Sequence, residues 1–284
     1  MTANIRPIEK VIISSRKNPL VRRLRLISTK AGREKHQMLL LEGTHLLEEA
    51  LHTDYFPKEI IATTSWLEKY SHILQLLQSG TQIIEVTQSV LETSLTTVNP
   101  DGVASLFPLS RLPLPPPDPK FILALDRIQD PGNLGNIFRT ALAADVDLIW
   151  LASGADPLNQ KVIRSSVGAI LKMPYERLGS NETESIEYLV KELNLAADRG
   201  FQIVATSSKN NNEYNSIPYW DIDWNKPTVL LLGNEGSGLH PSIQECSSCF
   251  ARLPHSDSIE SLNVAAVAVP ILLERRRVKM TKGM

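Results

Sequence analysis

The chain has 284 residues, of which 42% are apolar and 21% are charged. This balance is typical of a globular protein of about two domains, and it excludes intrinsic disorder, a collagen-like repeat and a small disulfide scaffold. Only Cys246 and Cys249 are present, so no disulfide framework points to secretion. The opening residues MTANIRPIEK lack the apolar core of a signal peptide. We therefore expect a cytoplasmic protein without a membrane span.

Charge is distributed unevenly along the chain. The net charge is −1, but residues 1–36 contain ten Lys or Arg and two acids, so this basic arm carries +8 and the remainder −9. A concentrated basic segment favours a polyanionic partner, although a solvated helix face explains the charge about equally well. Apolar residues recur at helical spacing here and predict a helix over 17–34. The candidate phosphate-binding residues are Arg16, Lys17, Arg22, Arg23 and Arg25.

A proline-rich stretch divides the chain. Residues 108–119 hold six prolines, and proline lacks the backbone donor that a helix or an inner strand requires. We interpret this stretch as a semi-rigid linker between residues 1–107 and residues 120–284.

The first half reads as a small α/β domain. After the helix over 17–34, the pattern predicts strands near 38–41, 59–62, 82–86 and 102–107, with helices over 44–52, over 65–78 and after Thr87.

The second half alternates strand and helix more regularly. Strands are predicted at 121–125, 148–151, 201–206, 228–232 and 250–253. Helices are predicted over 134–142 and 160–172, in a short turn at Pro241, and over 261–277. This alternation predicts a parallel sheet with helices on both faces.

Ligands in such sheets bind beyond the carboxyl ends of the strands, which directs attention to three loops. The first loop spans residues 126–139. In it, Asn133 is either a helix cap or a polar site residue, and Arg139 falls six residues later at the edge of the buried helix face.

The third loop spans residues 253–263. Its last polar residues, Ser261 and Asn263, open an apolar helix, and they are either caps of that helix or site residues.

The second loop, Gly233-Asn-Glu-Gly-Ser-Gly238, follows the strand TVLLL. It is not a P-loop, because Leu239 and His240 stand where Lys and Ser or Thr are required, and its glycine order is not that of a dinucleotide fingerprint. Glu235 would repel phosphate and suits hydroxyls, amines or a cation. The six histidines do not cluster with carboxylates and the two cysteines lack a second ligand pair, so no metal site is expected.

Taken together, the stretches DPGNLGNIFRTA, LLLGNEGSGL and RLP…IESLNVAAVA resemble, in order and spacing, the three motifs of the SpoU–TrmH family of RNA 2′-O-ribose methyltransferases in the SPOUT superfamily. The resemblance covers residues 120–277. More loosely, ISSRKNPLVRRLRLI and LLLEGTHLLEEAL resemble the ribosomal-protein-like RNA-binding domain often attached to these enzymes.

The resemblance implies an α/β-knot, a deep trefoil knot that forms a pocket for S-adenosylmethionine. Gly233, Leu253 and Leu262 match positions whose backbone holds the cofactor, with Asn234 and Glu235 beside them. The polar residues that match the family's active site are Asn133, Arg139, Glu235, Ser261 and Asn263. Members of the family are homodimers in which each site draws on both subunits.

The expected function is therefore methyl transfer from S-adenosylmethionine to a ribose 2′-OH in structured RNA, with ribosomal RNA as the favoured substrate. Transfer RNA, an antibiotic-resistance version of the ribosomal reaction, and a non-catalytic RNA-binding or assembly factor are the alternatives. Arg139 is the family's candidate base, but guanidinium stays protonated in proteins, so orienting a phosphate or stabilising an oxyanion is physically easier. Asp257 replaces a glycine common in relatives, and Pro270 predicts a kink in the last helix.

Overall fold

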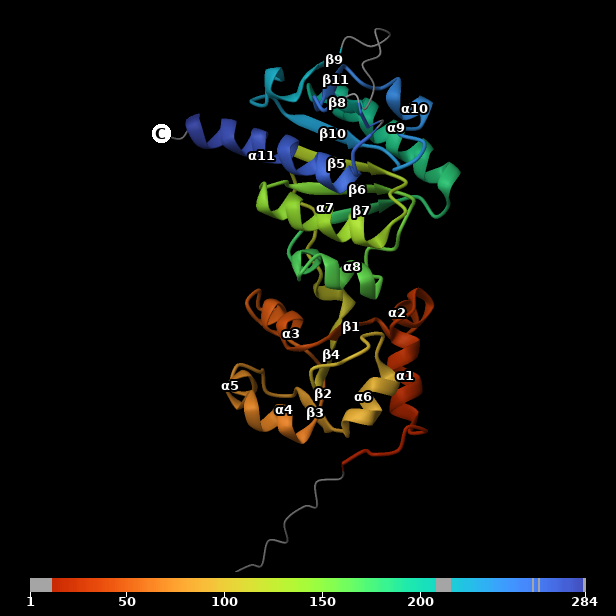
Figure 1. Ribbon diagram of the computed structural model, residues 1–284, viewed down its shortest axis with the longest axis vertical. Helices are drawn as coiled ribbons and strands as arrows, with labels where there is room; N and C mark the ends of the chain where they lie inside the picture. The colour runs from red at the N-terminus through yellow and green to blue at the C-terminus, as the bar shows by residue number, and fades with distance from the viewer. Residues whose placement is uncertain (1–11, 208–215, 257, 260, 283–284) are drawn as a thin grey trace, which may run out of the picture. The chain divides into compact units, whose positions relative to one another are not determined.

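The computed structural model describes residues 12–207, 216–256, 258–259 and 261–282, so Asp257 lies outside the described residues. The chain forms two compact units, the first ending at Arg111 and the second beginning at Leu112 (Figure 1). Within the described part of the chain, no helix is long and apolar enough to cross a membrane.

The first unit is built on a four-stranded mixed sheet of order β1-β4-β2-β3. Strand β4 pairs antiparallel with β1 and β2, whereas β2 and β3 are parallel. The strands are β1 (Met38–Glu42), β2 (Glu59–Ala62), β3 (Gln82–Glu85) and β4 (Val103–Pro108). The helices are α1 (Pro19–Ile27), α2 (Lys30–His36), α3 (Thr44–Leu51), α4 (Thr64–Lys69), α5 (Ser71–Leu74) and α6 (Gln88–Ser94), followed by the 3₁₀ turn η1 (Leu109–Arg111).

One face of this sheet is covered by α1 and α6. Leu20, Val21 and Leu24 of α1 are buried together with Val90 and Leu91 of α6 and with inward-facing residues of β1, β2 and β4. Burial of these side chains is what orients α1, because its remaining positions are then turned toward solvent.

Three expectations for this unit are wrong in detail. The helix predicted over 17–34 is two helices, because the Thr29 hydroxyl accepts the Gly32 N–H and starts α2 anew. The helix predicted over 65–78 breaks at Tyr70 into α4 and α5. Pro108, placed in the linker, ends the inner strand β4 opposite Met38, where a missing donor is tolerated because the ladder stops there.

The second unit contains a seven-stranded sheet of order β7-β6-β5-β10-β8-β11-β9 in which every pairing is parallel. The predicted parallel sheet is confirmed. Its strands are β5 (Phe121–Asp126), β6 (Leu148–Ala152), β7 (Tyr175–Leu178), β8 (Gln202–Ser207), β9 (Ser216–Pro218), β10 (Thr228–Leu232) and β11 (Cys249–Arg252). Its helices are α7 (Pro131–Ala143), α8 (Gln160–Ser165), α9 (Glu182–Asp198), α10 (Pro241–Gln244) and α11 (Val264–Lys282), with 3₁₀ turns η2 (Ala169–Leu171) and η3 (Tyr219–Asp221).

Helices cover both faces of this sheet (Figure 1). Ile122 and Ala124 of β5 face the side where Leu189 and Leu193 of α9 are buried. The opposite face carries α7 and α11, which pack against each other. On that face the buried Arg275 guanidinium of α11 lies 3.8 Å from the Phe121 ring centre.

The sequence pattern predicts no element over residues 173–200, where the structure has β7 and α9, and none where it has β9. Strand β7 is an edge strand without a continuous apolar run, so the strand criterion does not detect it. The helix predicted over 160–172 is wrong, because Val167 (φ 51°) and Gly168 (φ 80°) are left-handed and end α8 early. The last helix starts at Val264 rather than 261 and continues through Pro270.

Gly135 allows α7 to pack closely on α8, and this makes a testable stability prediction. A Cβ at this position would lie 1.9 Å from Ser165 Oγ and 2.7 Å from the Val162 carbonyl oxygen. We expect Gly135→Ala to destabilise the protein by about 1–3 kcal/mol through this overlap, which exceeds the gain of about 1 kcal/mol in helix propensity. Urea denaturation measures the difference. The matched control is Asn136→Ala at the next, exposed position, and a Gly135→Ala midpoint equal to or above that of the wild type would contradict the packing argument.

Candidate active site

The three loops singled out in the sequence follow β5, β10 and β11. Because these strands are parallel in one sheet, their carboxyl ends lie at the same edge. Strand β5 is next to β10, and β8 separates β10 from β11. Residues from positions 126–139, 233–240 and 253–263 are thereby brought to one side of the molecule.

A cavity of about 490 Å³ opens at this edge. It is bounded by the glycine-rich loop, by β8 and β11, by the loop after β11 and by α11. All five predicted cofactor residues, together with Ser261, are among the residues that line it, which include Thr206, Gly233, Asn234, Glu235, Ser237, Leu253, His255, Ser261, Leu262 and Ile271. The size falls within the usual range for small-molecule sites.

A chain of side-chain hydrogen bonds connects the three loops beside this cavity. Asn263 Nδ2 donates to Asn133 Oδ1 at 2.9 Å, and Asn133 Nδ2 donates to Glu235 Oε1 at 3.1 Å. Asn133 is therefore in direct contact with two other predicted catalytic residues, which follow it by 102 and 130 positions in the sequence.

Glu235 gives this chain its direction. Besides Asn133, its carboxylate accepts the backbone N–H groups of Gln129 at 3.3 Å and of Asp130 at 3.4 Å. A carboxylate only accepts hydrogen bonds, so the Asn133 amide must turn its NH₂ group to Glu235 and its oxygen to Asn263. The same contacts fix the loop between β5 and α7 to the loop after β10.

The helix caps differ from expectation at one end of this chain. Asp130, not Asn133, caps α7, since its Oδ1 accepts the Asn133 N–H at 2.8 Å. The alternative interpretation, in which Asn133 is the cap, is therefore wrong, and its side chain is free to bridge the loops. The Asn133 N–H, followed by the Lys161 ammonium, holds the pKa of Asp130 below its usual value.

At the other end, Asn263 fills both roles considered for it. Its Oδ1 accepts the N–H groups of Ala265 at 2.9 Å and Ala266 at 3.2 Å, which caps α11. Its Nδ2 remains available for Asn133. Ser261 does not cap the helix; it is exposed, lines the cavity and has no hydrogen-bond partner among the residues the structure describes.

The glycine-rich loop closes on itself. Asn234 and Gly238 exchange both backbone hydrogen bonds at 3.0 Å, and Asn234 Oδ1 accepts the N–H groups of Gly236 and Ser237. A Cβ at Gly233 would lie 2.5 Å from the Gly238 carbonyl carbon and from the Leu239 nitrogen. Only glycine fits there, because both neighbours are backbone atoms.

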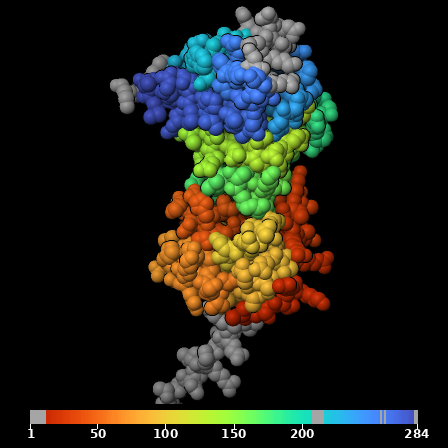
Figure 2. All heavy atoms as spheres, in the orientation of Figure 1, coloured from red at the N-terminus to blue at the C-terminus, as the bar shows by residue number. Residues whose placement is uncertain are grey.

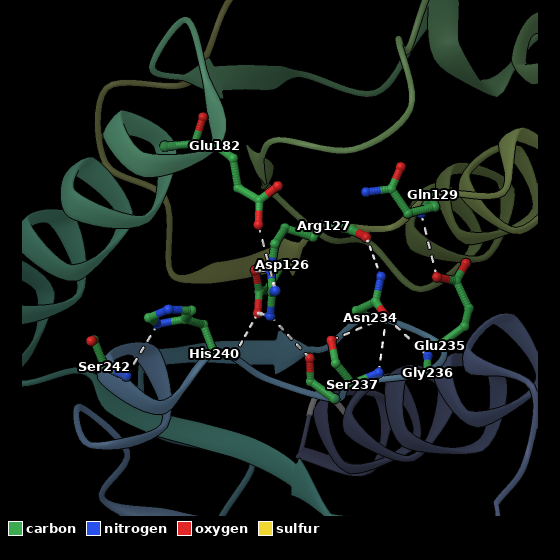
Figure 3. Close-up of polar contacts among 12 residues, drawn as sticks. Asp126, Arg127, Gln129, Glu182, Asn234, Glu235, Gly236, Ser237, His240 and Ser242 are labelled. Atoms are coloured by element: carbon green, nitrogen blue, oxygen red, sulfur yellow. Dashed lines mark hydrogen bonds and ion pairs between the residues drawn. The ribbon is translucent and has the colours of Figure 1, made fainter.

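A second polar network lies behind this loop, and sequence analysis missed it (Figure 3). Asp126 is fully buried at the end of β5 and forms a two-pronged ion pair with Arg127, at 2.7 and 3.0 Å. Its Oδ2 also accepts the His240 N–H at 2.7 Å. The available signal was an acid directly after the apolar run FILAL, where a carboxylate would need buried partners.

Arg127 extends this network in two further directions. Its carbonyl accepts Asn234 Nδ2 at 2.9 Å, and its guanidinium lies 3.7 Å from the Glu182 carboxylate of α9. The Asp126 carboxylate, which accepts two of its N–H groups, raises the pKa of Arg127 above its usual value.

Two further cavity residues were not predicted. The His255 ring nitrogen Nδ1 lies 2.8 Å from the Leu253 carbonyl oxygen, so the imidazole is held over the start of the third loop. Thr206, at the end of β8, donates its hydroxyl to the Leu231 carbonyl. Thr206 lies in none of the three motifs, and only the strand order brings it to the cavity, whereas His255 lies within the third loop but was not singled out there.

Arg139 is the predicted catalytic residue that neither lines the cavity nor joins the hydrogen-bond chain beside it, among the residues the structure describes. It is exposed on α7, does not line the cavity, and has no ion-pair or hydrogen-bond partner in the described ranges. Six residues of helix turn its side chain well away from the direction of Asn133.

The basic arm of the first unit divides into free and paired residues. The side chains of Arg16, Lys17 and Arg22 are exposed and have no polar partner within the described chain. Arg23 forms an ion pair with Glu59 of β2, and Arg25 Nε donates to the Thr93 carbonyl at 2.6 Å. In Figure 2 this segment, in red, forms one side of its unit.

No group of three or more His, Cys, Asp or Glu side chains that could hold a metal ion occurs among the described residues. The two cysteines are free, and burial raises the pKa of each thiol.

Comparison with known proteins identifies the family. Residues 120–274 match the model of the SpoU rRNA Methylase family, which is more than half of the chain. The chain belongs to this family. Residues 18–105 match the MRM3-like substrate binding domain.

Similar proteins extend over nearly the whole chain. An uncharacterized tRNA/rRNA methyltransferase of Synechocystis is 37% identical, with 93% of each protein covered. The 23S rRNA (guanosine(2553)-2′-O)-methyltransferase RlmP of Bacillus subtilis is 30% identical over 93% of this chain and 98% of that protein. The crystal structure of an AdoMet-bound rRNA methyltransferase from Sinorhizobium meliloti matches 94% of this chain and 98% of that one, with a TM-score of 0.75 and 29% identity.

Proposed function

We propose that this protein transfers a methyl group from S-adenosylmethionine to a ribose 2′-OH of ribosomal RNA. The observation that carries the proposal is the hydrogen-bond chain from Asn263 through Asn133 to Glu235, which joins the three family motifs beside a cavity of ligand size. Membership of the SpoU rRNA methylase family supports the reaction class.

The cavity suits the cofactor chemically. S-adenosylmethionine supplies a methyl group on a positively charged sulfonium, and this chemistry needs no metal. Gly233, Asn234, Glu235, Leu253 and Leu262 would hold it, since they line the cavity and combine apolar surface, backbone polar groups and one carboxylate. The missing Cβ of Gly233 lets the loop fold tightly enough to bring its backbone to the ligand.

The chain's own polar residues would position the acceptor. Orientation of two reactants alone can lower a barrier by roughly 7–11 kcal/mol, and a ribose hydroxyl is a poor nucleophile that depends on it. We assign this task to Asn133, Asn263 and Ser261, with Glu235 holding the Asn133 amide in one orientation. Arg139 would bind the phosphate beside the target ribose or stabilise the developing oxyanion, and the proton released from the 2′-OH would pass to solvent water rather than to the guanidinium.

A homodimer would complete the site. Helices α7 and α11 lie side by side on one exposed face of the second unit (Figure 2). On α11, Val269, Leu273 and Met280 are 41%, 42% and 58% exposed, which is unusual for an apolar stripe with helical spacing. A second copy packed on this face would cover the stripe and would meet Arg139, whose exposed guanidinium has no partner among the described residues.

Three finer expectations belong to the same proposal. A knot in the second unit is supported by the loop after β11, which passes the glycine-rich loop to reach Asn133 before α11 begins. An RNA-binding role for the first unit is supported by its match to a substrate binding domain and by its exposed basic residues. The cytoplasmic location stays a prediction.

Ribosomal RNA is favoured over transfer RNA by a relative that shares both halves of the chain. RlmP is named as a 23S rRNA methyltransferase, and the match covers 93% of this chain and 98% of RlmP. A second relative, the 23S rRNA (uridine(2479)-2′-O)-methyltransferase of Streptomyces viridochromogenes, covers 55% of this chain at 32% identity. RlmP modifies a guanosine and the Streptomyces enzyme a uridine, so we propose no particular nucleobase for the target nucleotide.

Cofactor binding is tested by two glycines in one loop. We expect Gly233→Ala to abolish S-adenosylmethionine binding measured by calorimetry, because the new Cβ would meet backbone atoms at 2.5 Å and force the loop open. Gly236→Ala is the matched control: its Cβ would meet only Asn234 Oδ1, at 3.6 Å, so the loop should keep its shape and binding should weaken far less than in Gly233→Ala, although Gly236 also lines the cavity. Failure of the wild type to bind would end the proposal.

The reaction is tested by mass-spectrometric mapping of ribose methylation in ribosomal RNA, with and without the protein. We expect one nucleotide to lose its methyl group without the protein and to regain it when purified enzyme and cofactor are supplied. Arg139→Ala and Asn263→Ala are each expected to slow the reaction about a hundredfold or more, as loss of a positioned polar group does. RNA binding without any methylation would instead favour the non-catalytic assembly factor.

The same two variants also test the shared site. If Arg139 of one subunit acts with Asn263 of the other, mixing the two inactive variants under exchange conditions should restore part of the activity. Mixtures as inactive as the separate variants, despite proven subunit exchange, would show that each site is built from one chain.

The basic arm is tested by the salt dependence of RNA affinity. We expect Arg22→Gln to reduce the slope of log affinity against log salt by roughly 0.7–0.9, because its exposed guanidinium can release one counterion. The neighbouring Arg23→Gln is the control, since Glu59 already pairs with Arg23. Equal slopes for Arg22→Gln and wild type would remove this arm from the RNA interface.

A further inference from the structure

The backbone of Arg127 is unusual for the place it occupies. Its φ is 54°, in the left-handed region that residues other than glycine, asparagine and aspartate rarely adopt. In an extended strand, the side chains of neighbouring residues point to opposite faces. The left-handed turn directly after β5 changes this, and it lets Arg127 fold back onto the carboxylate of its own neighbour, Asp126.

The same turn connects Arg127 to both ends of the glycine-rich loop. At the start of the loop, the Arg127 carbonyl accepts Asn234 Nδ2 at 2.9 Å. At its end, the guanidinium lies 3.5 Å from the Gly238 carbonyl oxygen, and Asp126 accepts the His240 N–H at 2.7 Å. Figure 3 shows Asp126 and Arg127, at the end of β5, facing Asn234 and His240 of the loop after β10.

The ion pair between Asp126 and Arg127 is largely shielded from water. The side chain of Asp126 is 1% exposed and that of Arg127 is 14% exposed. Among the described residues, the Asp126 carboxylate accepts hydrogen bonds from Arg127 and from the His240 N–H, so without Arg127 the His240 N–H alone would remain. A buried charge left in this way seeks water or a new cation, and the segment that carries His240 would have to move to provide it.

We propose that Arg127 is a positioning residue for the cofactor site: together with Asp126 it clamps the loop of residues 233–240 in the shape that binds S-adenosylmethionine. Arg127 does not line the cavity and acts through the loop. The inference rests on the proposed function, because it assumes that this loop holds the cofactor. Arg127 belongs to none of the residue sets predicted to be catalytic, cofactor-binding or RNA-binding.

The test combines a graded series at position 127 with calorimetry and steady-state kinetics on the full-length protein. Arg127→Gly keeps the backbone turn and its carbonyl but removes the guanidinium, and Arg127→Lys restores the charge without the two-pronged geometry. We expect the dissociation constant for S-adenosylmethionine to rise about tenfold or more in Arg127→Gly and less in Arg127→Lys. At saturating cofactor, kcat and the KM for RNA should stay near wild type.

Hydrogen–deuterium exchange gives a readout that does not depend on activity. Faster exchange of the Gly238 and His240 amides in Arg127→Gly, with the strands β5 and β10 still protected, would locate the effect in the loop. Arg199→Ala is the matched control: it also removes an arginine paired with an aspartate in the second unit, Asp118 at 3.5 Å, but lies outside the cavity lining. It should change neither cofactor affinity nor loop exchange.

The outcomes separate the two proposals. If the wild type binds S-adenosylmethionine and Arg127→Gly binds it equally well, the clamp is refuted and the function stands. If the wild type does not bind it, the function itself fails. If Arg127→Gly does not fold, Arg127→Lys decides: an affinity equal to wild type at unchanged thermal stability overturns the clamp, and weaker affinity at that stability supports it.

Discussion

The side-chain amide of Asn133 is the contact on which the proposed active site depends. It is the middle member of a chain that includes Asn263 and Glu235. Asn133 lies in the first turn of α7, Glu235 in the loop after β10 and Asn263 directly before α11. An amide can serve here because it donates and accepts at opposite sides, whereas its neighbour Glu235 can only accept. Without it, the loops after β5, β10 and β11 would share an edge of the sheet but no common geometry.

The sheet supplies the edge and the polar network supplies the alignment. The parallel strands β5, β8, β10 and β11 end at the same edge of the sheet, and this creates the cavity. The strand ends alone do not fix where the individual side chains of the site lie. Specific positions follow from groups that must be satisfied when buried or half-buried: the carboxylate of Asp126, the first amides of α7 and α11, and the closed turn from Asn234 to Gly238. The site therefore owes its shape to hydrogen-bond requirements as much as to the fold.

Sequence patterns predicted much of this arrangement, for identifiable reasons. The apolar run of β5 and the periodicity of α7 depend on neighbours in the sequence, so composition and spacing suffice. The breaks at Thr29 and Val167 were missed because each depends on one residue's backbone conformation. Strand β7 is too exposed to show an apolar run, whereas the buried positions Ser185, Leu189, Leu193 and Ala196 of α9 do follow helical spacing and could have predicted that helix.

Within the site, motif spacing indicated Asn133, Glu235 and Asn263, but not how they touch. The sequence alone could not assign the cap of α7 to Asp130, because Asn and Asp are equally good caps and Asp130 and Asn133 lie only three positions apart. Arg127 was missed since an arginine beside an aspartate usually reads as surface charge. Its backbone turn, visible only in three dimensions, makes it an internal group.

Asn263 joins two tasks that are usually separate, because one amide both starts α11 and holds Asn133. A change at this position would remove a cap worth about 1 kcal/mol and release the end of the helix that carries the exposed apolar stripe. A substitution of Asn263 would therefore have two separate costs. It would disturb the proposed active site through Asn133, and it would loosen the start of the helix on which the proposed dimer would form. A chain that had abandoned catalysis would still have a reason to keep this asparagine.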